Sequence, residues 1–474
     1  MPTLEESIKE VAKKSGADLV GLAGPSRFNG PPSIDPTYIL RGAKSVVSVV
    51  VGFNVPAIYD FLGKVSPYPH NIDEAICYQK GYRAATAVAQ FLISQGYKAK
   101  VVEPNAVYRR ALDPFATRPT FSHRFAAVIS GLGTFGLSGN VVTKEYGAGI
   151  MLDSVVTNAV LESDPVRPAR ETMETRCFNC KLCEKTCTMG MFRDDVEEYL
   201  LINGELHSRG KRNNLDFCNA PCFGLHGISR DKKWTNWGQF WIKDWMDGSP
   251  DPEQREKVRS TFMKVGARAG DSHERFMAII KMARNLYPKE LTEDFFPSYE
   301  NLPKDIESQK QLARKYYENL GVVLRDPCLV TCAQCVLVCG PDFEETKKRY
   351  DLLTTSGYVV PDANWDHIHV KTYEEAAALK AKYPRRVSTA DMIKDQQGQG
   401  AYWMKNFFGF EPIEEFKNWM YQRRAKAACA KAGLAGKEAK APIIVNPGYL
   451  MGLAGGSRKK KKREAPIKMT GMRK

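Results

Sequence analysis

The stretch Cys177-Phe178-Asn179-Cys180-Lys181-Leu182-Cys183-Glu184-Lys185-Thr186-Cys187 separates four cysteines by two, two and three residues. This spacing is typical of a [4Fe–4S] cluster site: three thiolates lie on a tight turn, and the fourth binds a second cluster. A second quartet follows, at Cys328, Cys332, Cys335 and Cys339. The two quartets together predict two clusters.

We expect the two quartets to exchange ligands. One cluster would be bound by Cys177, Cys180, Cys183 and Cys339, and the other by Cys328, Cys332, Cys335 and Cys187. Two adjacent clusters form a path for single electrons, so the sequence predicts an electron-transfer chain.

Other interpretations of the cysteines fit less well. A disulfide framework suits short secreted chains, and zinc is usually bound by two separated cysteine pairs. The quartets are irregular in two respects. Three residues, rather than two, separate Cys328 from Cys332, and neither quartet ends in Cys-Pro, since Thr188 follows Cys187 and Gly340 follows Cys339.

Four further cysteines lie outside the quartets. Cys77 and Cys429 fall in helical patterns and are interpreted as core or surface residues. Cys218 and Cys222 are different, because either could replace Cys328 as a cluster ligand. The sequence favours Cys328, which is adjacent to the other members of its quartet.

The 474-residue chain carries a net charge of +15, most of it at one end. Residues 423–474 hold 15 Lys and Arg and 2 Glu, and we expect 425–474 to be a basic, disordered tail. The tail is either solvated or contacts an anionic membrane surface, nucleic acid or an acidic electron donor. No apolar stretch approaches the roughly 20 residues of a membrane helix, and no basic signal region opens the chain. A cytoplasmic, anaerobic protein is expected.

Hydrophobic patterns predict an α/β or α+β core. The run of β-branched residues at 45–51 is typical of a buried strand. The other core elements expected are helices at 3–15 and 73–95, the second ended by Gly96, and strands at 18–22, 98–102 and 149–157. After the second quartet we expect a strand at 358–360 and helices at 373–382 and 412–424.

Residues 188–327 separate the quartets and are expected to be largely helical, at 252–268, 272–286 and 304–320. Four tryptophans in this insertion are spaced by three, four and four residues, which predicts that they share one helix face: Trp234, Trp237, Trp241 and Trp245. They form either core or a wall over an apolar substrate.

A glycine-rich segment, Ser130-Gly131-Leu132-Gly133-Thr134-Phe135-Gly136-Leu137-Ser138-Gly139, precedes the first quartet. Its glycines would let the backbone approach a flat or anionic ligand, although an ordinary turn is the alternative.

This segment, then Val142-Thr143-Lys144-Glu145-Tyr146-Gly147, then Val155-Val156-Thr157 and the first quartet, resembles the cobalamin-dependent iron–sulfur reductases. These are the reductive dehalogenases and the epoxyqueuosine reductases, whose stretches read Ala-Gly-Leu-Gly-x-x-Gly and Ile-Thr-x-Glu-Tyr-Gly before the same cysteines. The resemblance covers about 70–190 and 326–345.

The resemblance implies an α+β fold: a nitroreductase-like corrinoid-binding core, a ferredoxin-like module with two [4Fe–4S] clusters, and a helical insertion. It implies base-off cobalamin without a protein histidine ligand, its edge held by Gly131, Leu132, Gly133, Gly136, Tyr146 and Gly147. The expected domains are a core at 1–172, the cluster module at 173–200 and 321–350, a Trp-rich helical insertion at 201–320, a C-terminal wrap at 351–424 and the tail.

The resemblance also implies chemistry at cobalt. The clusters would supply electrons to form Co(I), and a protein acid would protonate the product. A tyrosine beside a cation suits this role, and the main candidates are Tyr82, Tyr108 and Arg109. Tyr78, Arg83, Arg110 and Arg124 are further candidates, whereas His123 is interpreted as a structural hydrogen-bonding residue.

Some positions depart from both enzyme groups. The dehalogenase stretch Pro-x-Val-Arg-Leu is Ala148-Gly149-Ile150-Met151-Leu152 here, without the arginine. The catalytic Asp of the epoxyqueuosine reductases is absent from residues 116–118, and no C-terminal helical repeat is evident.

The expected function is therefore a reductive dehalogenase-like oxidoreductase that cleaves a carbon–halogen or similar bond. Its expected partners are a small organic, halogenated or related substrate and a ferredoxin- or flavodoxin-type donor. The alternatives are a two-cluster electron-transfer protein without its own substrate and a tRNA-modifying enzyme of the epoxyqueuosine reductase type.

Overall fold

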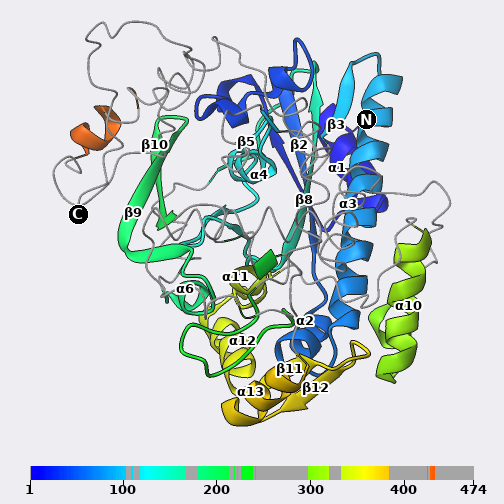
Figure 1. Cartoon of the computed structure of the whole chain (residues 1–474). Helices are drawn as coiled ribbons and strands as arrows, with labels where there is room; N and C mark the ends of the chain where they lie inside the picture. The colour runs from blue at the N-terminus through cyan, green and yellow to red at the C-terminus, as the bar shows by residue number, and fades with distance from the viewer. Residues whose placement is uncertain are drawn as a thin grey trace, which may run out of the picture.

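The core of the computed structural model is a four-stranded antiparallel sheet of order β1-β2-β8-β3 (Figure 1). Its strands are β1 (Leu19–Ala23), β2 (Ser45–Gly52), β8 (Ile150–Thr157) and β3 (Ala99–Val102). The structure describes residues 2–102, 108–109, 118–166, 177, 180–212, 218, 221–222, 226–238, 241, 297–319, 332–383, 424 and 427–432.

Helices cover both faces of this sheet. On one face α1 (Leu4–Lys14) and α3 (Tyr68–Ser94) pack on Val47, Val49 and Val155, and the other face receives α4 (His123–Ile129). The valines alternate between the faces because successive strand residues point in opposite directions. Each fully buried valine contributes roughly 1.5–3 kcal/mol to stability, so the valine-rich strands hold the layers together.

The strands and helices expected for this core are confirmed to within a few residues. One helix is longer than predicted. Helix α3 begins at Tyr68, five residues before the predicted start, and Gly96 ends it with φ +87°. All pairs in the sheet are antiparallel, which agrees with an α+β rather than an α/β architecture. The nitroreductase-like and ferredoxin-like assignments stay predictions.

A long hairpin contradicts the helical insertion expected from residue 201. Strands β9 (Phe192–Ile202) and β10 (Glu205–Arg212) are joined at Asn203 and Gly204, which have φ +52° and +85°. Asn-Gly with two positive φ angles is the sequence signal of a tight hairpin turn. The signal was present in the chain, and the expectation of a helical insertion missed it.

The tryptophan-rich part of the insertion is not helical between 226 and 238. Isolated bridges join Ile228 to Thr235 and His226 to Trp241, so the predicted shared helix face is wrong for the described residues. Trp234 and Trp237 are each 3% exposed and pack with residues of α2 (Val55–Leu62), which makes them core residues. Trp245 lies outside the described residues.

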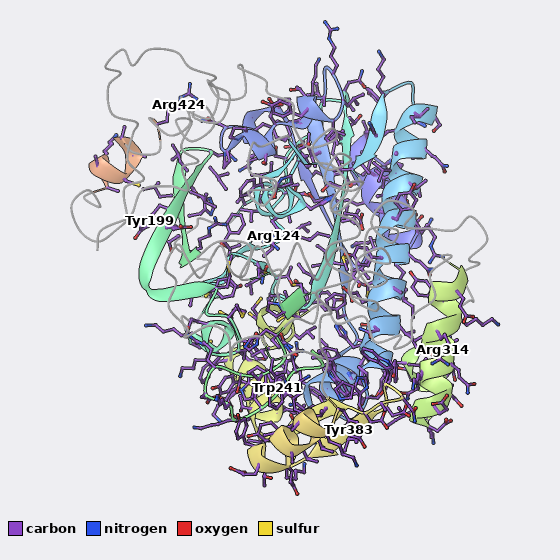
Figure 2. All side chains as sticks on the ribbon, in the orientation of Figure 1. Arg124, Tyr199, Trp241, Arg314, Tyr383 and Arg424 are labelled. Atoms are coloured by element: carbon purple, nitrogen blue, oxygen red, sulfur yellow. The ribbon has the colours of Figure 1, made fainter. Side chains whose placement is uncertain are left out.

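A smaller layer lies below the sheet in Figure 1 and is built mainly by residues 334–382. It contains the elements α6 (Leu182–Lys185), α11 (Gln334–Leu337), α12 (Phe343–Thr355), β11 (Tyr358–Pro361), β12 (His367–Val370) and α13 (Tyr373–Lys382). Figure 2 shows Trp241 in this layer, where its ring stacks on Tyr373 of α13 at 6.2 Å. Strand β11 and helix α13 confirm the elements predicted there.

Helix α10 (Ile306–Asn319) confirms the helix predicted at 304–320 and lies beside α3. The helices predicted at 252–268 and 272–286, most of 412–424 and the basic run of the tail lie outside the described residues. Among the described helices, none has both the length and the apolar character that a bilayer span requires.

Candidate functional site

The two cysteine segments have the same local backbone. Lys181 and Ala333 both adopt left-handed φ angles, +60° and +41°, and each precedes a four-residue helix, α6 or α11. These residues occupy the same place in Cys180-x₂-Cys183-x₃-Cys187 and Cys332-x₂-Cys335-x₃-Cys339. The shared spacing therefore produces two matching turns, and α6 and α11 contact one another.

The first thiol group is Cys177, Cys180, Cys183 and Cys339. Burial raises the pKa of Cys183 well above its usual value, and the charges of Cys339, Cys335, Cys177 and Cys180 raise it further. Burial likewise raises the pKa of Cys339 to about 12, with Cys177 and Cys180 adding to the effect. Cys339 thus lies close to Cys177 and Cys180 of the other quartet, while Cys335 also lies near both Cys183 and Cys339.

The second thiol group is Cys187, Cys332, Cys335, Cys218 and Cys222. Burial raises the pKa of Cys187 to about 12, and the charges of Cys335 and Cys218 contribute. Burial also raises the pKa of Cys332 well above its usual value, with additions from Cys187, Cys335 and Cys218. Hence Cys187 lies near Cys335 and Cys218, and the crossed exchange of ligands stays a prediction.

Cys222 joins this group through its neighbours. Its hydrogen bond with Cys218 is the largest cause of its raised pKa, followed by burial and by the charges of Cys218 and Cys332. Cys328 lies outside the described residues. The structure therefore brings Cys218 and Cys222, which the sequence ranked below Cys328, to the second group.

The thiol groups fit the chemistry of iron–sulfur ligands. A pKa raised in the metal-free protein is expected of buried thiols that a metal deprotonates on binding. In the described part of the chain, no three Cys, His, Asp or Glu side chains close on one point as a single chelated ion requires. A cubane spaces its ligands more widely, because each sulfur binds a different iron atom.

Hydrogen bonds to sulfur join the cysteines to the glycine-rich segment. The N–H of Leu137 donates to Cys177 Sγ at 3.3 Å, and the Asn140 Nδ2 amide donates to Cys335 Sγ at 3.5 Å. The N–H of Met191 donates to Cys187 Sγ at 3.1 Å. Such bonds stabilise thiolates and tune cluster potentials, so the segment serves the cysteines directly.

At the glycines in and after that segment, other atoms of the protein occupy the space that a side chain would need. A Cβ at Gly131, which has φ +75°, would lie 2.2 Å from Pro165 O, and one at Gly133 would lie 2.5 Å from Val142 O. Gly147 has φ +61°, and its Cβ would lie 2.3 Å from Cys339 O. A Cβ at Gly136 would lie 2.9 Å from Val142 Cγ2. At these positions the missing side chain does not leave an open cradle for a corrinoid.

The remaining predicted cofactor residues also pack on the protein. Leu132 is half-buried against the group of apolar core residues that includes Phe135. The Tyr146 ring lies against Gly52. Burial raises the pKa of Tyr146, and the charges of Asp18 and Glu145 add to this. Corrinoid contacts at these residues stay predictions, and no reaction step is assigned to them.

The predicted catalytic residues are only partly described. Tyr82 is half-buried on α3, and Tyr108 and Arg109 form a short strand, β4, paired with Pro119 and Arg118 of β5 (Arg118–Pro119). The catalytic roles of all three stay predictions. His123 Nδ1 lies 2.9 Å from Ser154 Oγ, a structural contact of the kind expected for it.

A buried carboxyl group escaped the sequence analysis. Asp153 is 1% exposed in the middle of β8, and neither of its oxygens has a hydrogen-bond partner. A Cβ at Gly81 of α3 would lie 2.1 Å from Asp153 Oδ2, so a larger residue there would require the Asp153 side chain to move. Burial raises the pKa of Asp153 to about 7. A single charged residue in this strand of mainly apolar residues was the available signal.

No family model matches the chain, and neither does any curated protein. Among solved structures, the catabolic reductive dehalogenase NpRdhA is similar at 16% identity and a TM-score of 0.35. The match covers 45% of this chain and only 28% of that enzyme. The epoxyqueuosine reductase from Streptococcus thermophilus is 14% identical, with 91% of this chain and 99% of that one covered and a TM-score of 0.33.

An epoxyqueuosine reductase solved with a modified tRNA-Tyr stem loop is also similar, at 17% identity and a TM-score of 0.32. That match covers 74% of this chain and 98% of the reductase. The similar structures therefore come from the same two enzyme groups that the sequence resembles.

Proposed function

We propose that this chain is a reductase in which two [4Fe–4S] clusters pass single electrons toward a corrinoid. The reaction would be the reductive cleavage of a carbon–halogen or similar bond in a small organic molecule. One observation supports the electron-transfer part: helices α6 and α11, which belong to the two cysteine quartets, contact one another, so the two quartets lie side by side. Crossed thiols are the arrangement that two adjacent cubanes require.

The ligand sets follow from the two thiol groups. Cys177, Cys180, Cys183 and Cys339 would bind the first cluster, and Cys187, Cys332 and Cys335 would supply three ligands of the second. We favour Cys218 as the fourth, because its charge raises the pKa of both Cys187 and Cys332. Cys222 is instead influenced by Cys218 and Cys332, and it is not among the charges that raise the pKa of Cys187 or Cys332. Cys328 is the competing assignment.

The corrinoid and substrate parts of the proposal rest on the sequence resemblance. A bound corrinoid would supply a cobalt centre that accepts electrons and reacts with the substrate. The chain's own contribution would be to bind the substrate and to hold a proton near the reacting carbon. Tyr82, Tyr108 and Arg109 remain the residues proposed for the proton.

The test is anaerobic purification of the full chain with and without added cobalamin. About one cobalt per chain, retained through gel filtration, supports the proposal, as does product formation from halogenated aromatics or alkenes with a chemical reductant. Clusters present without cobalt uptake would remove the corrinoid part and leave the electron path standing.

A second function is favoured by a specific observation. The glycines at 131, 133 and 147 are filled by backbone of the protein itself, which leaves the segment serving the cysteines rather than an external ligand. A two-cluster electron-transfer protein without its own substrate needs no more than this. It predicts cluster spectra and exchange of electrons with a partner, with no cobalt uptake.

A further inference from the structure

A cavity of about 220 Å³ is lined in part by residues that follow the last cysteine of the second quartet. Its lining includes Pro341, two residues after Cys339, and Gly149. Next to Gly149, the N–H of Ala148 donates to Cys339 O at 2.9 Å. The two backbone segments pack so closely that a Cβ at Gly147 would lie 2.3 Å from Cys339 O. The segment that bonds to Cys339 and the segment that follows Cys339 thus both contribute to the cavity lining.

The walls of the cavity suit a flat aromatic guest. Three rings contribute to the lining, from Phe53, Tyr59 and Tyr146, and Val55 and Ile58 add aliphatic surface. The volume is below the roughly 300–1,000 Å³ of sites for drug-sized ligands, so one small ring system fills it. Aromatic walls bind such rings by stacking or edge contacts, and they also attract cations.

The charges around the cavity favour a cation. Three carboxylates line it, those of Glu145, Asp342 and Glu345. Arg349, 2% exposed, also lines it, but its Nε is already paired with Glu345 Oε1 at 2.6 Å. Lys348 is the other cation nearby, with its Nζ 4.3 Å from the centroid of the Tyr59 ring. The carboxylates still outnumber the cations.

We propose that this cavity is the electron-input site of the protein and takes a planar, positively charged aromatic one-electron carrier. The inference rests on the proposed function, because it needs a cluster at Cys339. The carrier would lose one electron, and the cluster bound by Cys339 would gain it. No bond forms and no proton moves, so the step is balanced as written.

Methyl viologen is a suitable probe, since it is a small planar dication and its reduced form donates single electrons. Two variants change the cavity: Val55→Trp fills it from an exposed wall position, and Glu145→Lys reverses a charge at its mouth. Each has a matched control that does not line the cavity. Val65→Trp adds the same ring at an exposed site, and Glu344→Lys makes the same charge reversal in the first turn of α12.

Stopped-flow bleaching of the cluster absorption should saturate with the concentration of reduced methyl viologen. We expect Val55→Trp to slow it about 10-fold or more, and Glu145→Lys about 3- to 10-fold at low salt. Both controls should stay within about 2-fold of the wild type. Calorimetry with oxidised methyl viologen should show matching losses of affinity, and dithionite, a small anion, should reduce all variants at similar rates.

The outcomes separate the two proposals. A protein without cluster absorption would refute the proposed function. Clusters that bleach at the same rate in Val55→Trp, Glu145→Lys and the controls would overturn the electron-input site alone. The same holds if viologen bleaching never saturates, or if the controls fall as far as the cavity variants.

Discussion

Residues 180–187 and 332–339 share the same backbone conformation but lie in different environments. Each has a left-handed residue before a four-residue helix, and each spaces its cysteines by two and three residues. The first thiol group comes entirely from the two quartets, whereas the second also draws on Cys218 and Cys222. Short spacing thus determines the turn, while distant residues determine which thiols complete each site.

The largest effect should come from removing a member of the first thiol group. Cys183→Ala should lose about four of about eight irons per chain, because three thiolates hold a cubane poorly. Iron analysis of anaerobically purified protein measures this, with Cys77→Ala as a control for a buried cysteine outside both groups. If Cys183→Ala held as much iron as Cys77→Ala, Cys183 would not be a cluster ligand and the first thiol group would not be a cluster site.

The fourth ligand of the second cluster can be identified by comparing three cysteine variants. We expect Cys218→Ala to lower iron content by up to about four per chain, and Cys222→Ala and Cys328→Ala to lower it less. Electron paramagnetic resonance of the reduced protein would show whether one cluster signal disappears. If Cys328→Ala alone abolished a signal, the fourth ligand would be Cys328 and the sequence-based assignment would be right.

Asp153 offers a contrast to the thiols, because it is a buried ionisable group with no metal or hydrogen-bond partner to stabilise its charge. Its pKa is raised from 3.8 to about 7, so between these values the folded state binds more protons than the unfolded state. The contribution of Asp153 to stability should therefore fall as pH rises through this window, by roughly 2 kcal/mol from about pH 5.5 to about pH 7.

Denaturant unfolding at those two pH values would measure the loss. Asp153→Asn, which keeps the shape but cannot ionise, should lack this contribution, so the free energy of unfolding of the wild type minus that of the variant should fall by roughly 2 kcal/mol between the two pH values. Asp73, whose pKa burial raises to about 6, and His70 and His207, whose pKa burial lowers to about 4, act in both proteins and cancel in this difference. A difference between wild type and variant that stays constant or grows over the same range would contradict this account of Asp153.

The smallest effect concerns the glycine-rich segment, which donates to one thiol of each group. Asn140→Leu removes the amide that donates to Cys335 Sγ, a bond worth about 1 kcal/mol. Because a hydrogen bond to sulfur favours the reduced, more negative cluster, its loss should lower one reduction potential by roughly 40 mV. A redox titration followed by electron paramagnetic resonance would detect it, and the other cluster should be unchanged.

The sequence predicted the core well because its signals were local. The β-branched run at 45–51, the helix ended by Gly96 and the strand at 358–360 each depend on nearby residues, and all three are confirmed. The hairpin at 192–212 also carried a local signal, Asn203-Gly204, but the expectation of a helical insertion overrode it.

The rest of the site depends on contacts between distant residues. Nothing in the spacing of Trp234 and Trp237 distinguishes a helix face from two core residues on irregular backbone. Nor could the sequence show that Gly147 packs against Cys339, or that Cys218 reaches the second thiol group. These depend on how the insertion folds back, which the periodicity of a single chain does not encode.

Iron and acid-labile sulfide, measured per full-length chain after anaerobic purification, test the central claim most directly. Two cubanes predict about eight irons and about eight sulfides, with the Mössbauer parameters of [4Fe–4S] clusters. About four irons, or zinc in place of iron, would contradict the crossed two-cluster path on which the account depends.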